Sequence, residues 1–377
     1  MRSLRAALTK LLGIPPLSAP TDGELRGTLR LDGIVVEKWV FSAEEGSRIP
    51  ANLYRPGFNG PSADSRSPAV VMTHGHGDSK GVVQQSFVAQ TFARAGIACL
   101  LADPLGEEER SADGDVGTRE HDDPTVAYRS ELVGRSVMGK LVFDTMRSID
   151  FLEGLPFIDS ARIAVAGNSL GGAVATWLFA LESRVRATIV SGWAISDILA
   201  TRVGKFCTRV PNRKLRALCD WPEFLSLASE KNELLVMNGD ADVVIDKDGT
   251  GVVWRETDAH LRAADPQGAH LRSWYCPNGG HRPYQGTARA LRFIHETLGT
   301  PALTSGEIDA LEEVHFGSWC DKHGGKIEDL YGTELHYRGT MLPDLGQVAI
   351  AREDLAVLRR EEIGAAQYTV DGWLNNN

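Results

Sequence analysis

A serine set among glycines at the end of an apolar run is the residue in this chain best suited to act as a nucleophile. The segment IAVAGNSLGG at 163–172 predicts a buried strand, a sharp turn that carries Ser169, and the start of a helix. Such a turn lifts the hydroxyl away from the backbone and leaves no room for side chains at Gly167 and Gly171. The pattern predicts a nucleophile elbow, and the alternative is an ordinary turn with a capping serine.

Two later strand ends carry the residues that a serine nucleophile needs. The apolar run at 234–237 leads to Asp240 and Asp242, and the run at 271–275 leads to His281. A serine hydroxyl attacks only if an imidazole accepts its proton and a carboxylate orients that imidazole. We predict His281 as the base and Asp242 as the acid, since Asp240 is better placed to cap the turn. Each fits an ordinary loop alone, so the prediction depends on the order serine, acid, histidine.

A further apolar run, at 69–73, enters the glycine-rich sequence HGHG at 74–77. Acyl transfer places negative charge on the carbonyl oxygen, and backbone N–H groups aimed at that oxygen stabilise it. We expect the N–H groups of Leu170 and His76 to form this oxyanion hole. The alternative is a metal site at His74 and His76, which two histidines without a nearby third ligand support poorly.

With these residues assembled, the chain resembles the α/β-hydrolase superfamily, and within it the branch of acetyl xylan esterases and dienelactone hydrolases. The likeness is carried by residues 11–16, 74–77, 103–107, 134–135, 167–172, 238–239 with Asp242, and 279–281. It implies a serine esterase with Ser169, Asp242 and His281 as its triad. The chemistry expected of these residues requires no cofactor, and no metal site is predicted. The Arg-Gly-Gln element of the cephalosporin-C deacetylase type is missing, so the resemblance does not extend to a preference for sugar acetates.

Two other functions stay open on the residues alone. Prolyl oligopeptidase-type peptidases share the Ser-x-Gly-Gly elbow, although this chain has no room for their β-propeller, and amide hydrolysis passes through the same acyl intermediate. A protein without catalytic activity could also use this scaffold to bind a ligand.

Composition limits the classes of partner. The net charge of -10 and the pI of about 5.5 disfavour nucleic acid and anionic membranes, which attract basic proteins. The 5 cysteines are scattered and odd in number, which favours reduced thiols and a cytoplasmic protein. Charges interrupt residues 1–12, so we expect an amphipathic helix there rather than a signal peptide. The expected partner is a small ester.

Strand-like and helical segments alternate through the middle of the chain. The strand-like ones lie at 69–73, 96–102, 163–166, 187–191, 234–238 and 271–275. This alternation predicts a doubly wound, mostly parallel sheet over the catalytic domain at 66–300, with the proposed site at the carboxyl ends of the strands. Before it, residues 1–65 predict a helix and an edge hairpin formed by 34–42 and 48–54. A single long helix is expected over 125–155.

A lid-like helical insertion is expected at about 194–230, after Trp193, which is our best candidate for a wall of the substrate pocket. For the aromatic residues inside the insertion we expect packing in the core rather than a role in the pocket. These residues are Phe206, Trp221 and Phe224.

Residues 301–377 form an extension that matches no function in its sequence. Helices are expected at 305–314 and 352–362. A packed extension or a contact in a homo-oligomer is favoured over a second catalytic unit, because no reactive group of residues stands out. His315 and Cys320, with His323, have poor spacing for a metal.

Overall fold

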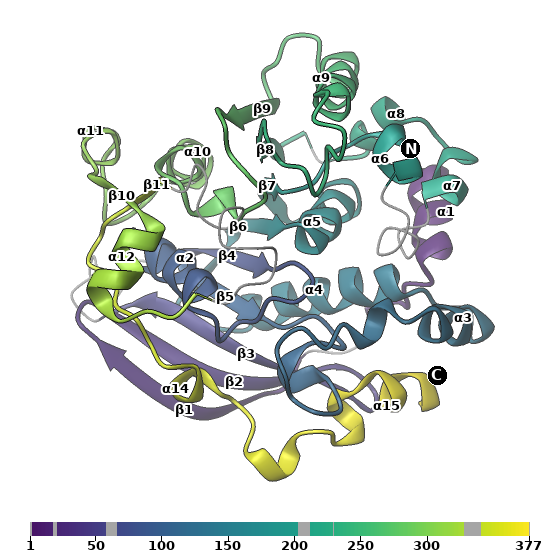
Figure 1. Cartoon of the computed structure of the whole chain (residues 1–377). Coiled ribbons are helices and arrows are strands. Elements are labelled where there is room, and N and C mark those ends of the chain that lie inside the picture. The colour runs from purple at the N-terminus through teal and green to yellow at the C-terminus, as the bar shows by residue number, and fades with distance from the viewer. Residues whose placement is uncertain are drawn as a thin grey trace.

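A nine-stranded sheet runs through the molecule, with helices on both of its faces (Figure 1). The computed structural model describes residues 2–17, 21–57, 66–202, 212–228, 230–327 and 341–376. The strands of the sheet are β1 (Gly23–Leu31), β2 (Ile34–Glu44), β3 (Ser47–Pro56), β4 (Ser67–Thr73), β5 (Ala98–Ala102), β6 (Ile158–Asn168), β7 (Val185–Ser191), β8 (Glu233–Gly239) and β9 (Leu271–Cys276). A separate pair is formed by β10 (Glu313–His315) and β11 (Met341–Pro343).

The described α-helices lie between and after these strands. They are α1 (Arg2–Leu12), α2 (Val83–Arg94), α3 (Pro124–Leu132), α4 (Val137–Glu153), α5 (Leu170–Leu181), α6 (Asp197–Arg202), α7 (Asn212–Arg216), α8 (Trp221–Leu225), α9 (Val252–Ala264), α10 (Ala288–Leu298), α11 (Ser305–Asp309), α12 (Phe316–His323), α14 (Arg352–Leu355) and α15 (Val370–Asn375). Within the described residues, no helix combines the length and apolar character that crossing a bilayer requires.

The strand order β1-β2-β3-β5-β4-β6-β7-β8-β9 confirms the predicted doubly wound sheet. The six strands from β5 to β9 in this order are parallel, and β1 to β3 join them in antiparallel pairing. The chain passes from β4 to β5 on one side and then crosses to β6 on the other. The loops after β4 and β6 therefore separate at this switch point, which is where open α/β sheets bind their ligands.

Both faces of the parallel sheet are covered by apolar packing. Along β4, Ala69 and Val71 contact the core cluster that includes α4 and α5, whereas Val70 and Met72 contact the cluster that includes α2 and α10. Because successive side chains of a strand point to opposite faces, a continuous apolar run such as this one indicates a strand buried on both sides.

The antiparallel part is larger than the predicted hairpin. β2 and β3 pair as an edge hairpin would, with Trp39 opposite Ala51, but β1 extends the sheet by one more strand. β1 is mostly exposed or half-buried, with Thr28 opposite Glu37. It therefore lacks the alternation of buried side chains by which a strand is recognised in a sequence.

The single helix expected over 125–155 is wrong, because two helices occupy this stretch. α3 ends at Leu132, and Gly134 then takes a backbone φ of 73°. Ser136 starts α4, since its side chain accepts a hydrogen bond from the N–H of Gly139. A positive φ followed by a capping serine interrupts a helix even where its apolar pattern continues.

The described part of the insertion packs onto the domain. Phe224 makes edge contacts with Trp221, at 5.6 Å between ring centroids, and with Trp177 of α5, at 5.2 Å. The prediction that Trp221 and Phe224 pack in the core is thus confirmed. Phe206 lies outside the described residues.

The C-terminal extension is packed against α2 and β2. In α12, Trp319 and Phe316 contact Phe87 of α2, with ring centroids 4.8 Å and 5.6 Å away. Further along, Tyr368 packs in a cluster with Val40 of β2. Figure 1 shows the yellow C-terminal segment running past the β1–β3 side of the sheet. These aromatic side chains of the extension are thus buried against the rest of the chain.

Both helices expected in the extension are shorter than predicted. α11 ends at Asp309, and Val314 pairs with Leu342 in the β10–β11 ladder. α14 ends at Leu355, because the following backbone N–H groups donate to a buried glutamate, Glu109, rather than to helix carbonyls. In both cases a contact distant in sequence outweighs the local helix preference.

Candidate active site

Ser169 stands at a strained turn between β6 and α5. Its backbone has a φ of 57° and a ψ of -116°, which a residue other than glycine rarely adopts. A Cβ at Gly167 would lie 2.1 Å from the carbonyl oxygen of Gly171, and a Cβ at Gly171 would lie 2.5 Å from that of Thr73. The predicted need for glycine at both positions is therefore confirmed.

Asp242 and His281 form a buried pair at the ends of β8 and β9. Nδ1 of His281 donates to Oδ2 of Asp242 at 2.7 Å, and both side chains are inaccessible to solvent. The other carboxylate oxygen of Asp242 accepts from the N–H groups of Val244 and Ile245 at 2.9 Å and 3.1 Å. Since Nδ1 keeps its proton in this hydrogen bond, Nε2 is the nitrogen left to accept one. Asp240 is exposed and does not occupy this place.

Two glycines show how closely the separate segments approach Ser169. A Cβ at Gly192, just after β7, would lie 3.3 Å from the backbone nitrogen of Ser169 and 3.0 Å from Cε1 of His281. A Cβ at Gly75, just after β4, would lie 2.8 Å from Cβ and 3.4 Å from Oγ of Ser169. The imidazole of His281 and the loop that holds His76 therefore both border the serine.

The loop after β4 contains His76, whose ring packs against a second histidine. The ring of His76 stacks on that of His121, with centroids 5.0 Å apart, and both side chains are buried. Nε2 of His76 lies 3.9 Å from Asp122. His121 was not predicted as a site residue, because nothing in its local sequence distinguishes it from a solvated loop residue.

The ring of His74 is engaged by protein groups. Its Nε2 lies 3.0 Å from Oδ1 of Asp103, and its Nδ1 lies 3.0 Å from the carbonyl oxygen of Gly75. Burial would lower the pKa of His74, but the hydrogen bond and charge of Asp103 outweigh it and raise the pKa to about 9. Both ring nitrogens of His74 therefore already have protein partners. Among the described residues, the one group with metal-ligand spacing is Asp197, Glu256 and His260, which includes none of the histidines considered from the sequence.

Glu107 braces the same loop from the side of β5. Its carboxylate accepts from the N–H of Gly77 at 2.9 Å and from the N–H of Arg119 at 3.4 Å. The side chain is fully buried, and this desolvation raises its pKa to about 7 despite the two N–H donors.

We expect this raised pKa to show in the stability of the protein. The folded chain binds the Glu107 proton more tightly than the unfolded chain, so the stabilisation is complete below pH 4.5 and is lost as the pH rises through about 7. Glu107→Gln keeps an oxygen acceptor for Gly77 without the charge. The free energy of unfolding of the wild type should fall between pH 5 and 8 by up to about 3 kcal/mol more than that of the variant. Urea unfolding at several pH values measures this, and parallel curves for the two proteins would contradict it.

Gly75→Ala tests how tightly the loop packs on the serine. The new methyl group would meet Cβ of Ser169 at 2.8 Å, so the loop or the serine must move. We expect kcat/KM for ester hydrolysis to fall about 100-fold, as for a displacement of about 1 Å in an active site. Gly306→Ala is the matched control, because nothing lies within 4 Å of a Cβ there. A Gly75→Ala protein as fast as the control would show that the loop does not touch the reacting geometry.

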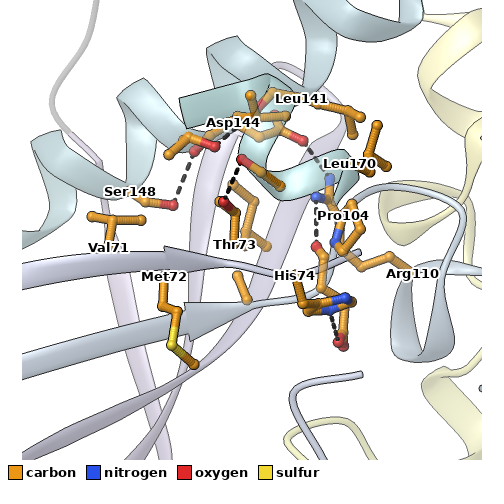
Figure 2. Close-up of a pocket in the computed structure, with 16 residues that line it drawn as sticks. Val71, Met72, Thr73, His74, Pro104, Arg110, Leu141, Asp144, Ser148 and Leu170 are labelled. Carbon is orange, nitrogen blue, oxygen red and sulfur yellow. Dashed lines mark hydrogen bonds and ion pairs between the residues drawn. The ribbon is translucent and has the colours of Figure 1, made fainter. Parts of the chain in front are cut away.

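A small cavity lies beneath the elbow, between the end of β4 and helices α4 and α5 (Figure 2). Figure 2 shows Thr73, His74, Arg110 and Leu170 around it. Its volume of about 30 Å³ suits a water molecule and not an ester. Trp193 does not line this cavity; it packs in the core at 4 % exposure, and its role in a substrate pocket stays a prediction.

Known proteins share this architecture. The family described as acetyl xylan esterase (AXE1) matches residues 28–198. The protein named "Putative hydrolase YtaP" of Bacillus subtilis (strain 168) is 21% identical over 196 residues, which are 49% of this chain and 62% of that relative. The match therefore spans less than two thirds of the relative's length.

Solved structures of two acetyl xylan esterases superpose on the chain. The enzyme from Paenibacillus sp. R4 is 18% identical with a TM-score of 0.55, over 78% of this chain and 93% of its own. Acetyl Xylan Esterase 1 from Thermoanaerobacterium sp. JW/SL YS485 is 17% identical with a TM-score of 0.52, over 79% and 98%. The chain therefore has the α/β-hydrolase fold that its sequence predicts, and its residues 28–198 are similar to the acetyl xylan esterase family.

Proposed function

We propose that the protein is a serine hydrolase that cleaves a carboxylic ester through an acyl-enzyme intermediate. Ser169, His281 and Asp242 are its triad, and no cofactor takes part. The observation that carries the proposal is the buried pair of Asp242 and His281, 2.7 Å apart, at the sheet edge where Ser169 stands at a φ of 57°. This is the arrangement by which a base and its orienting acid activate a serine.

The reaction proceeds in two halves. Nε2 of His281 takes the proton of Ser169 as Oγ bonds to the acyl carbon, and the N–H groups of Leu170 and His76 hold the negative carbonyl oxygen. One such N–H group is typically worth about 3 to 4 kcal/mol to the transition state. His281 then gives its proton to the departing alcohol. Water, activated by the same imidazole, releases the acid and restores the serine.

The comparisons support the ester as the substrate class. The matching family and both structural relatives are named as acetyl xylan esterases. Peptidase or amidase activity would use the same intermediate, and a ligand-binding protein would bind its ligand without forming it.

A panel of substrates tests the proposal. Para-nitrophenyl esters of increasing acyl length, acetylated sugars and aryl amides are offered to the wild-type protein, with Ser169→Ala as the blank for spontaneous hydrolysis. We expect turnover of at least one ester series and much slower turnover of amides. Faster turnover of amides than of esters would make the protein an amidase, and no turnover of any substrate would favour the binding role.

A further inference from the structure

The C-terminal extension reaches acidic side chains that lie inside the protein close to the proposed site. Nε of Arg352 donates to Oε1 of Glu108 at 2.8 Å. The backbone N–H groups of Val357 and Leu358 donate to Oε1 of Glu109 at 2.8 Å and 2.7 Å. Both glutamates are 4 % exposed, so these contacts bind the extension to the interior of the catalytic domain.

One lysine holds these glutamates from the other side. Nζ of Lys80 lies 3.1 Å from Oε2 of Glu108 and 2.7 Å from Oε2 of Glu109. It also lies 2.6 Å from Oδ2 of Asp103. Burial would lower the pKa of Lys80, but the three carboxylates raise it well above its usual value. The lysine is therefore a buried ammonium ion that depends on all three partners.

Asp103 connects Lys80 with the loop at 74–77 after β4, which carries the N–H of His76 and is called the oxyanion loop below. Its Oδ1 accepts from the backbone N–H of Lys80 at 2.8 Å and from Nε2 of His74 at 3.0 Å. Nδ1 of His74 donates to the carbonyl oxygen of Gly75 at 3.0 Å. That carbonyl and the N–H of His76 belong to one planar peptide unit. Fixing the carbonyl therefore fixes the direction in which the N–H of His76 points.

We propose that the C-terminal extension is a positioning element of the active site, because Arg352 and the backbone at 357–358 hold Glu108 and Glu109 on Lys80 and thereby set the oxyanion loop. The inference rests on the proposed function, in which the N–H of His76 stabilises the oxyanion. None of these extension residues touches the substrate in this account.

These linked contacts explain why a change in the extension should affect the rate of ester hydrolysis. Without Arg352, Glu108 keeps its bonds to Lys80 and Ser79 but loses a cationic partner. Burial and the nearby charge of Asp103 already raise the pKa of Glu108. A protonated Glu108 would bind Lys80 less strongly, and a partly satisfied buried network adjusts its geometry. The change would then reach Asp103 and the loop.

Arg352→Gln is the first test, with Arg359→Gln as its matched control. Arg352 has a side chain that is 40 % exposed, so its replacement should leave the protein folded. Arg359 lies in the same extension, and its side chain pairs with Glu361 and Glu362 rather than with Glu108 or Glu109. We expect kcat for ester hydrolysis to fall about tenfold in Arg352→Gln, with KM little changed, and to stay at the wild-type value in Arg359→Gln. Arg352→Lys should recover part of the loss.

A double-mutant cycle separates positioning from a general loss of stability. His74→Gln breaks the last link of the chain and should lower kcat by itself. If the extension acts through His74, Arg352→Gln should have no further effect on kcat in the His74→Gln protein. Independent effects that multiply, or a fall in thermal stability with unchanged kcat, would overturn the inference.

The outcomes also separate this inference from the proposed function. A wild-type protein that neither hydrolyses esters nor reacts with a fluorophosphonate at Ser169 would end both. A wild-type protein that does both, with an equally fast Arg352→Gln variant, would end this inference and leave the proposed function standing.

Discussion

Replacing Ser169 with alanine is expected to lower kcat for ester hydrolysis by about 10⁴- to 10⁶-fold, because no other group then forms the acyl enzyme. The loss should appear in kcat, since the serine hydroxyl acts in the chemical step. Initial rates with the best ester of the substrate panel measure it.

The variant should remain folded. Ser169 is buried at a φ of 57°, and alanine fits the same backbone with one atom fewer. A thermal midpoint close to that of the wild type would confirm that the loss is chemical. If Ser169→Ala kept more than a few per cent of the activity, another residue would be the nucleophile.

Asp242→Asn is expected to lower kcat by about 10⁴-fold while leaving the fold intact. An amide at this position can donate to Nδ1 of His281, which favours the tautomer with its proton on Nε2. An imidazole in that form cannot accept the proton of Ser169. The rate should recover little at high pH, because the tautomer and not the charge of His281 is wrong.

Asp240→Asn is the control for this experiment. Both aspartates follow β8, but Asp240 is exposed whereas Asp242 is 0 % exposed and bonded to His281. We expect the Asp240 variant to stay within about twofold of the wild-type rate, as for a surface substitution. A large loss in Asp240→Asn and a small one in Asp242→Asn would reverse the assignment.

The sequence allowed the elbow and the place of each reactive residue to be predicted, because each is marked by its own local pattern. Gly167 and Gly171 are required by sterics within five residues, and each strand end is marked by its own apolar run. The parallel sheet was predicted from the same apolar runs, since a strand buried on both faces does not alternate apolar and polar residues. The contact between Asp242 and His281 depends on β8 and β9 being neighbours in the sheet. Local sequence patterns do not determine this strand order.

The buried charges could not be predicted in this way. Lys80, Glu108 and Glu109 would each be expected at the surface, where charged side chains usually lie. Their burial depends on partners far along the chain, such as Arg352, 244 residues after Glu108. The same dependence explains why the helix expected at 352–362 stops early, since its N–H groups are used by Glu109.

Reaction of the folded protein with a fluorophosphonate, with the adduct located by mass spectrometry, tests whether His281 activates Ser169. We expect one adduct, on Ser169, and a labelling rate that falls at least about 100-fold in His281→Gln, because general-base assistance is worth that much. An unlabelled wild-type protein, an adduct on another residue, or labelling of Ser169 that does not depend on His281 would contradict it.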